Sequence, residues 1–226
     1  VFSSSCTVYG VPDKTPVKET ASIKPAFSPY GYTKQVGERI LNDFFKSLPS
    51  SSLTLLRYFN PIGAHPSGLI GELPIGVPSN LVPYITQTAI GKRKKLTVFG
   101  KDYDTPDGTC IRDYIHVVDL ANAHVSALEK GLKSKGSIKT LNVGTGKGAS
   151  VLDVITAFEK VSKQELKYGF GPRRSGDVPK IYSDNTLIKN ELDWDAKFSL
   201  EDCLEHSWNW EKNLLKFKYK SEKKQD

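Results

Sequence analysis

The first sixty residues alternate between a short apolar run, an amphipathic segment and a second apolar run. The opening run VFSSS ends in small polar residues, as strands of a parallel sheet do at their carboxyl ends. Ser28 followed by Pro29 is a typical helix start, and apolar residues recur at helical spacing as far as Pro49. Residues 53–59 are again short, apolar and extended. This order predicts a right-handed strand–helix–strand unit of a parallel α/β sheet.

The remainder of the chain continues the alternation after one long loop. Residues 62–82 are rich in Gly and Pro, and long loops in compact domains usually serve function. We expect helices over 80–90, 118–130 and 151–161, and after Ser183 and Ser199. We expect strands over 96–99, 112–117, 139–143 and 165–168, with a turn-rich excursion over 103–110.

Composition excludes several protein classes. The chain has 226 residues, 38% of them hydrophobic and 25% charged, which is typical of a globular protein. No apolar stretch approaches the roughly 18 to 20 residues of a membrane span. The three cysteines form no CxxC pair, so we expect a reduced, cytoplasmic protein. Because the chain begins at Val1 and contains no methionine, we expect it to be part of a longer protein.

The net charge of +7 raises the possibility of a polyanion partner, so the location of the charge matters. Residues 212–226 hold six lysines and two acids, which accounts for +4 of it. We expect a frayed, solvated terminus there and a solvated loop at residues 92–95. The sequence therefore predicts neither a nucleic-acid partner nor a membrane partner.

Tyr30 and Lys34 are four residues apart, which places both side chains on one face of the predicted helix. An ammonium group beside a phenol stabilises the phenolate and makes it a usable general base. Spacing alone is weak evidence, because Tyr219 and Lys223 repeat it in the tail. The strand end at residues 3–5 adds serine hydroxyls that could bond a substrate oxygen. Capping of the strand end is the alternative role for these serines.

Two other ligand classes are disfavoured. The four histidines show no ligand spacing with one another or with the cysteines, so no metal site is predicted. The glycines of GTGKG lack the following GKS or GKT of a P-loop, so a turn between sheet and helix is favoured there.

Five long motifs carry a resemblance to a known family. They are FSSSCTVYG, SPYGYTK, RYFNPIGAHPSG, LTVFGKDYDTPDGTCIRDYIHVVDLA and RRSGD. In this order the chain resembles the UDP-glucose 4-epimerases of the extended short-chain dehydrogenase/reductase superfamily. The resemblance implies the C-terminal part of a Rossmann-type, doubly wound parallel sheet that binds NAD, followed by a smaller α/β domain that binds a UDP sugar. It assigns residues 1–61 to the first domain and 62–226 mainly to the second, with a return to the first at about 111–145. The glycine-rich N-terminal units of the family would be missing, so we expect the chain alone to be inactive.

The resemblance also implies roles for individual residues. Tyr30 matches the proton acceptor, and Lys34 the lysine that bonds the nicotinamide ribose. Ser5 matches the serine that orients the sugar 4-hydroxyl, and Tyr58 packs at the nicotinamide. These residues would let C4 of the sugar pass hydride to NAD and recover it on the other face.

The remaining implied residues hold the UDP sugar. Arg112 and Arg174 offer planar charged groups for the diphosphate, and Asp177 accepts from the ribose hydroxyls. Taken singly, these residues could instead form a local Arg112–Asp113 ion pair, a turn or core packing. The full implied set is Ser5, Cys6, Thr7, Tyr58, Phe59, Asn60, Ser79, Asn80, Leu81, Thr97, Val98, Phe99, Arg112, Arg174, Asp177 and Ile181.

Departures from related patterns leave alternatives open. Sugar-nucleotide 4,6-dehydratases carry an Asp-Glu pair after the threonine, where this chain has Val8 and Tyr9, so epimerisation is favoured. Ile181 is neither the open nor the closed case for N-acetyl sugars. Another UDP sugar therefore remains an alternative substrate, and a non-catalytic binding module that uses the basic tail remains an alternative function. The resemblance also implies a homodimer through the helix that carries Tyr30.

Overall fold

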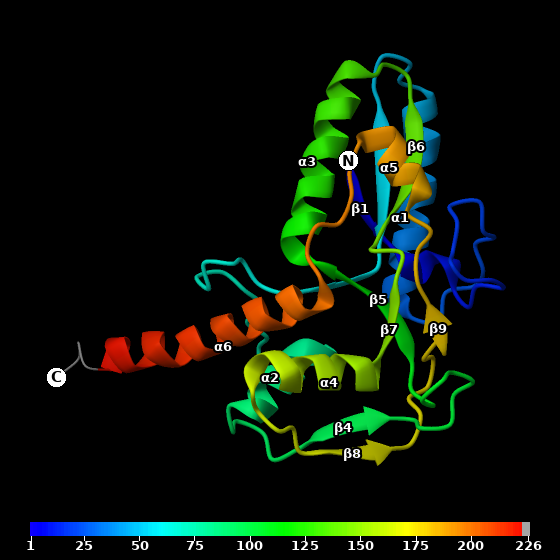
Figure 1. Cartoon of the computed structure of the whole chain (residues 1–226). Coiled ribbons are helices and arrows are strands. Elements are labelled where there is room, and N and C mark those ends of the chain that lie inside the picture. The colour runs from blue at the N-terminus through cyan, green and yellow to red at the C-terminus, as the bar shows by residue number, and fades with distance from the viewer. Residues whose placement is uncertain (223–226) are drawn as a thin grey trace.

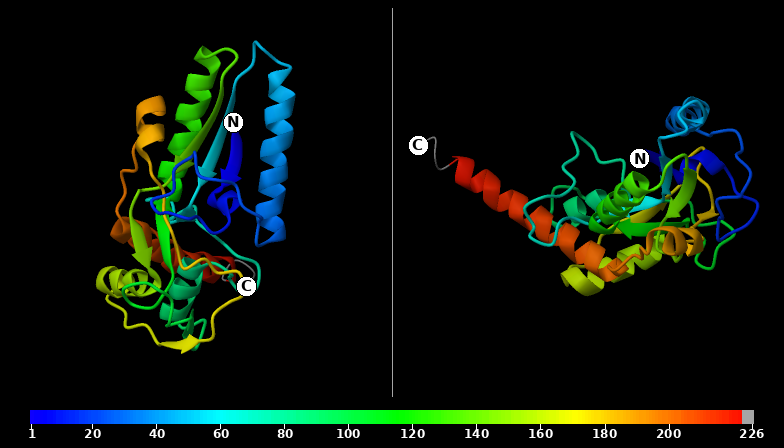
Figure 2. Two further views of the ribbon diagram at one scale, coloured as in Figure 1. Left: turned by 90° about the vertical axis from the view of Figure 1, so that its right-hand side faces the viewer. Right: turned by 90° about the horizontal axis from the view of Figure 1, so that it is seen from above.

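A three-stranded parallel sheet forms one half of the protein. The computed structural model describes residues 1–222, with side chains as far as residue 216. The sheet has the order β1-β2-β6, with strands Phe2–Ser5, Leu53–Tyr58 and Ile138–Val143. It lies between helix α1 (Pro29–Lys46) and helix α3 (Val117–Lys133), as Figures 1 and 2 show. The strand–helix–strand unit expected from the sequence is confirmed, because β1 and β2 pair in parallel with Ser5 opposite Tyr58.

Helix α1 begins where the sequence predicts. The Ser28 side chain accepts a hydrogen bond from the Gly31 amide at 3.1 Å, which satisfies one of the free donors of the first turn. Pro29 occupies the first turn, where its missing N–H costs nothing. A short 3-10 helix, η1 (Cys6–Tyr9), follows β1 and was not predicted.

A second group of strands continues from the end of β2. Strand β3 (Asn60–Ile62) pairs in parallel with β5 (Ile111–His116), so Asn60 and Pro61 extend the chain into a new sheet. Strands β7 (Gly148–Ser150) and β9 (Lys180–Ile181) also pair with β5. Strands β4 (Leu96–Phe99) and β8 (Tyr168–Gly171) form a separate parallel pair.

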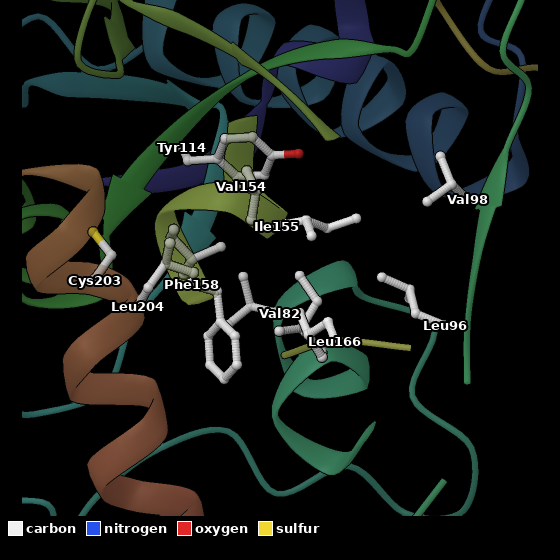
Figure 3. Packing of buried hydrophobic residues seen from close by; sticks show 12 residues of the cluster. Val82, Leu96, Val98, Tyr114, Val154, Ile155, Phe158, Leu166, Cys203 and Leu204 are labelled. Carbon is white, nitrogen blue, oxygen red and sulfur yellow. The ribbon is translucent and has the colours of Figure 1, made fainter. Parts of the chain in front are cut away.

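Three helices enclose the core of this second half. They are α2 (Leu81–Ala89), α4 (Val151–Ser162) and α6 (Leu200–Glu222), and α6 runs out from the body of the molecule in Figure 1. Figure 3 shows the interior, where Phe158 of α4 lies among side chains of α2 and α6. Phe158 and Leu204 are fully buried. Helix α4 carries a reciprocal capping box between Ser150 and Asp153, at the start of the helix predicted over 151–161.

Several predicted bounds differ from the structure. The strand expected at 165–168 is wrong in position, because β8 begins only at Tyr168, where it pairs with β4. The frayed terminus expected from residue 212 is also wrong in part, because the backbone stays helical to Glu222. The helix expected after Ser183 is α5 (Thr186–Leu192), which packs on β6 and α3.

The expected return of the chain to the first sheet involves α3 and β6, whereas β5 belongs to the second group of strands. The boundaries of the two domains therefore remain a prediction. All three cysteines are free and buried. Among the described residues, no helix is long and apolar enough to cross a membrane.

Candidate active site

Tyr30 and Lys34 lie together at the carboxyl end of β1. The Lys34 ammonium donates to the Ser3 carbonyl oxygen at 2.9 Å and lies 5.4 Å from the centre of the Tyr30 ring. Tyr30 itself is half exposed. The main-chain carbonyl of β1 thus holds a positive charge beside an accessible tyrosine ring.

Tyr58 joins this pair from the end of β2. Burial raises the pKa of Tyr58, and the nearby Tyr30 phenol raises it further. Ser5, which is opposite Tyr58 in the sheet, completes the edge at which the strands end.

The three serines of β1 have three different partners. Ser3 Oγ bonds His124 Nε2 at 2.8 Å, and Ser4 Oγ donates to the buried Glu38 carboxylate. Ser5 Oγ accepts from the Thr7 amide at 3.3 Å and so caps η1, which was the structural alternative for this residue. The Thr7 hydroxyl is buried and has no hydrogen-bond partner among the described residues.

A buried charged network that the sequence did not predict stands behind these serines. Arg57 of β2 makes a two-point contact with Glu38 of α1, at 2.8 Å and 2.6 Å. Burial alone would lower the pKa of Arg57, but the hydrogen bonds and charges of Glu38 and Tyr9 together outweigh it, and the pKa is raised. The Arg57 guanidinium also lies over the Tyr9 ring, 4.8 Å from its centre. The network joins α1, β1 and β2, the three elements that carry the candidate catalytic side chains.

A cleft of about 650 Å³ opens in the second half of the protein. Ten of the predicted substrate residues line it: Asn60, Ser79, Asn80, Leu81, Thr97, Val98, Phe99, Arg112, Arg174 and Asp177. Its walls therefore combine β3, the Gly- and Pro-rich loop, α2 and β4. The lining also includes residues that were not predicted, among them Tyr84, Cys110 and Tyr114.

The cleft carries two arginines and one carboxylate. Asp177 lies between them, 3.2 Å from Arg174 Nε and 3.7 Å from Arg112 Nη2. The local Arg112–Asp113 ion pair considered from the sequence is absent from the described residues, because Arg112 turns to Asp177 and to the Val178 carbonyl. Two positive charges facing one negative charge make this cleft suited to an anionic ligand.

The other predicted residues lie outside the cleft. Cys6, Phe59 and Ile181 are buried together in one apolar cluster. Burial raises the pKa of the Cys6 thiol to about 12, with Arg112 opposing the rise. A neutral thiol there is consistent with packing and makes Cys6 a poor nucleophile.

The glycines of GTGKG form the turn between β6 and β7. The buried Asp113 carboxylate accepts hydrogen bonds from the Thr145 amide at 2.8 Å and the Gly146 amide at 3.2 Å. It also accepts from the Ser183 hydroxyl at 2.6 Å. The chain's own carboxylate therefore occupies the main-chain amides of this turn. The turn expected between sheet and helix is wrong in part, because it leads to strand β7, and α4 begins only after that strand. The residues that the structure describes contain no group of three or more potential metal ligands.

The chain is similar to known proteins over almost its whole length. A family model described as GDP-mannose 4,6 dehydratase matches residues 1–207. The chain belongs to this family. It is 54% identical over 211 residues to a UDP-glucose 4-epimerase of Bacillus subtilis. This alignment covers 93% of this chain and 62% of the relative. A UDP-glucose 4-epimerase of Haemophilus influenzae is 52% identical over 213 residues, with 94% and 63% covered. The chain thus spans about three fifths of the length of these relatives.

Solved structures resemble this family member closely. One is a UDP-glucose-4-epimerase of Stenotrophomonas maltophila with bound NAD and formylated UDP-arabinopyranose, with a TM-score of 0.92 and 48% identity over 95% of this chain and 63% of the other. Another is the Bifidobacterium longum enzyme in complex with NAD+ and UDP, with a TM-score of 0.90 and 46% identity over 94% and 63%. The Rossmann-type α/β fold expected from the sequence is confirmed.

Proposed function

We propose that this chain carries the proton acceptor and the sugar-nucleotide cleft of an NAD-dependent UDP-glucose 4-epimerase. The enzyme would interconvert UDP-glucose and UDP-galactose through a 4-keto sugar. The proposal is carried by the half-exposed Tyr30 beside the anchored Lys34, together with a cleft that holds two arginines. The similarity to named UDP-glucose 4-epimerases supports it.

In this proposal Tyr30 accepts the proton of the sugar 4-hydroxyl and later returns it. Lys34 stabilises the phenolate, and its bond to the Ser3 carbonyl keeps the ammonium in place during turnover. Ser5 and the Thr7 hydroxyl would supply hydrogen bonds to the sugar, and Thr7 would thereby gain the partner that it lacks among the described residues.

NAD fits this edge of the sheet, because Tyr30, Lys34 and Tyr58 surround the end of β1 and β2, where dinucleotides bind in such folds. When bound, NAD would supply the hydride acceptor and donor for C4 of the sugar. Lys34 and Tyr58 would hold the nicotinamide end.

The cleft would hold the UDP part. Arg112 and Arg174 would bind the diphosphate, and Asn80 and Leu81 stand at the start of α2 beside it. Phe99, with Thr97 and Val98, would receive the uracil. Asn60, Ser79 and Asp177 are further proposed contacts in the cleft. Cys6, Phe59 and Ile181, which lie outside it in a buried cluster, complete the proposed set.

Epimerisation is favoured over dehydration although the family model bears a dehydratase description. Val8 and Tyr9, at the positions where dehydratases carry an acid pair, are fully buried. The Tyr9 hydroxyl donates to Asn142 at 2.6 Å, and burial raises its pKa to about 12 despite the nearby Arg57. Neither side chain can serve as the acid or base of an elimination.

We also propose a cytoplasmic homodimer. The outer face of α1 exposes Val36, Ile40 and Phe44, which a second copy would cover. The buried free cysteines suit a reducing compartment.

The test is conversion of UDP-galactose to UDP-glucose by the protein expressed with any coding sequence that precedes Val1 in its gene. We expect Tyr30→Phe to lower kcat at least about a hundredfold. Tyr32→Phe, on the same helix and also exposed, is the matched control and should retain activity. If the wild type folds and holds NAD but converts nothing, the substrate assignment is wrong, and N-acetylhexosamine and pentose derivatives of UDP are tested next.

A further inference from the structure

We propose that Arg173 is a positioning residue that latches the loop after β8 and so holds Arg174 and Asp177 at the rim of the cleft. The inference rests on the proposed function, because it assumes that the cleft binds a nucleoside diphosphate. Neither Arg173 nor its partner Asp102 lines the cleft. Their contribution would therefore be indirect.

Arg173 makes three contacts with the segment that follows β4. Its Nε donates to the Asp102 carboxylate at 2.8 Å, and its Nη2 donates to the Asp102 carbonyl. Its guanidinium also lies over the Tyr103 ring, 4.3 Å from the ring centre. One planar side chain thus binds a charge, a main-chain oxygen and an aromatic face at once, which is a combination that arginine provides and lysine does not.

The receiving side of this latch is firmly built. Tyr103 is 6% exposed, although most of the neighbouring turn is at the surface. Gly100 has a φ of +78°, and a Cβ there would lie 2.4 Å from the Tyr103 ring, so the backbone packs directly on the ring. The Gly100 amide donates to the Gly171 carbonyl at 2.9 Å, which ties the ends of β4 and β8 together. Arg173 therefore contacts a segment, around Gly100 and Tyr103, that its own packing holds in place.

The latch determines where Arg174 lies. Arg174 follows Arg173 directly, and its guanidinium lies over the Phe99 ring, 5.0 Å from the centre. Arg174 also bonds Asp177, which in turn pairs with Arg112. Arg173 thus stacks on Tyr103 outside the cleft, and Arg174 stacks on Phe99 inside it. Without the contacts of Arg173, Arg174 would be free to move until the ligand binds. The entropy lost when the ligand orders Arg174 would then reduce the affinity.

The test measures binding of UDP by calorimetry to the protein expressed with any upstream coding sequence. We expect Arg173→Ala to raise the Kd for UDP about three- to tenfold. Arg173→Lys keeps the charge without the planar contacts and should give a smaller but clear increase. Lys101→Ala removes an exposed positive charge from the same turn and should leave the Kd unchanged within about twofold.

Asp102→Ala distinguishes a latch from simple charge attraction. Loss of a negative charge near the cleft would strengthen binding of an anion through the field alone. Loss of the latch would weaken it. We expect a weaker UDP complex, while uridine, which lacks the diphosphate that Arg174 would hold, binds equally to wild type and variant. In turnover assays the same variants should raise KM for the UDP sugar with little change in kcat.

The outcomes separate the two proposals. A wild type that does not bind UDP would refute the proposed function. A wild type that binds UDP, together with an Asp102→Ala variant that binds it as tightly or more tightly, would overturn the latch alone. An equal loss of uridine and UDP binding would also overturn it, because the residue would then act on the fold of the cleft.

Discussion

The Glu38–Arg57 pair offers a sharp test of how the candidate active site is held. Both side chains are about 8% exposed, and they meet in a two-point contact to which Ser4 adds a hydrogen bond. Glu38→Gln would remove the carboxylate and leave a permanently charged guanidinium in the interior. Breaking one side of such a pair costs about 3–5 kcal/mol of unfolding free energy. For a domain of this size the melting temperature should fall by about 6–20 °C.

The assay is urea unfolding of wild type and variants at pH 7, followed by far-UV circular dichroism. Asp43→Asn is the matched control, because Asp43 pairs with Lys46 at 2.9 Å on the same helix but both side chains are more than 60% exposed. We expect that control to cost less than about 0.5 kcal/mol. The double variant Glu38→Leu with Arg57→Leu should recover most of the loss, since no charge is then left unpaired. A single variant that costs under about 1 kcal/mol would refute the reasoning.

Three further predictions address other parts of the fold. Burial, aided by His206, lowers the pKa of His116 from 6.5 to about 4, so its contribution to stability is complete above pH 6.5 and is lost as the pH falls towards 4. Wild type should therefore lose about 3 kcal/mol more than His116→Gln between pH 7 and pH 4 in urea unfolding; equal losses would contradict this. Gly100→Ala should destabilise the fold more than Gly91→Ala in thermal unfolding, because both have positive φ but a Cβ at Gly91 meets nothing within 4 Å; equal effects would show that contact with Tyr103 is unimportant. Phe158→Ala should cost about 3–5 kcal/mol by chemical denaturation, since the ring is fully buried, and a cost below about 1 kcal/mol would show that the core refills the cavity.

Local signals predicted most of the elements because each has a local cause. Ser28 and Pro29 mark the start of α1, and Ser150 marks the start of α4. An N-cap side chain accepts from a main-chain amide only a few residues away, so the signal is local. The position of β8 was missed because its apolar content is low and its partner β4 lies about seventy residues earlier in the chain. Pairing over such distances leaves no periodic signal in the strand itself.

The candidate site likewise contains residues that local sequence spacing predicts and residues whose partners only the tertiary fold provides. Tyr30 and Lys34 share a helix face, and their spacing therefore shows in the sequence. The partners of Arg57, Asp113 and Arg173 cannot be predicted from sequence spacing, because the tertiary fold brings each charge to its partner. A charged residue in an apolar run, such as Arg57 within LTLLRY, is the signal that a buried partner exists, although it does not say which residue provides it.

The order of strands in the first sheet has a consequence for synthesis on the ribosome. Strand β2 pairs with β1 on one side and with β6 on the other. About 80 residues separate the end of β2 from the start of β6. At roughly 5–20 residues per second, translation takes about 4–16 s to deliver that third strand. During this interval one edge of β2 presents unpaired main-chain N–H and C=O groups, and the nascent chain is then most exposed to aggregation and to capture by chaperones.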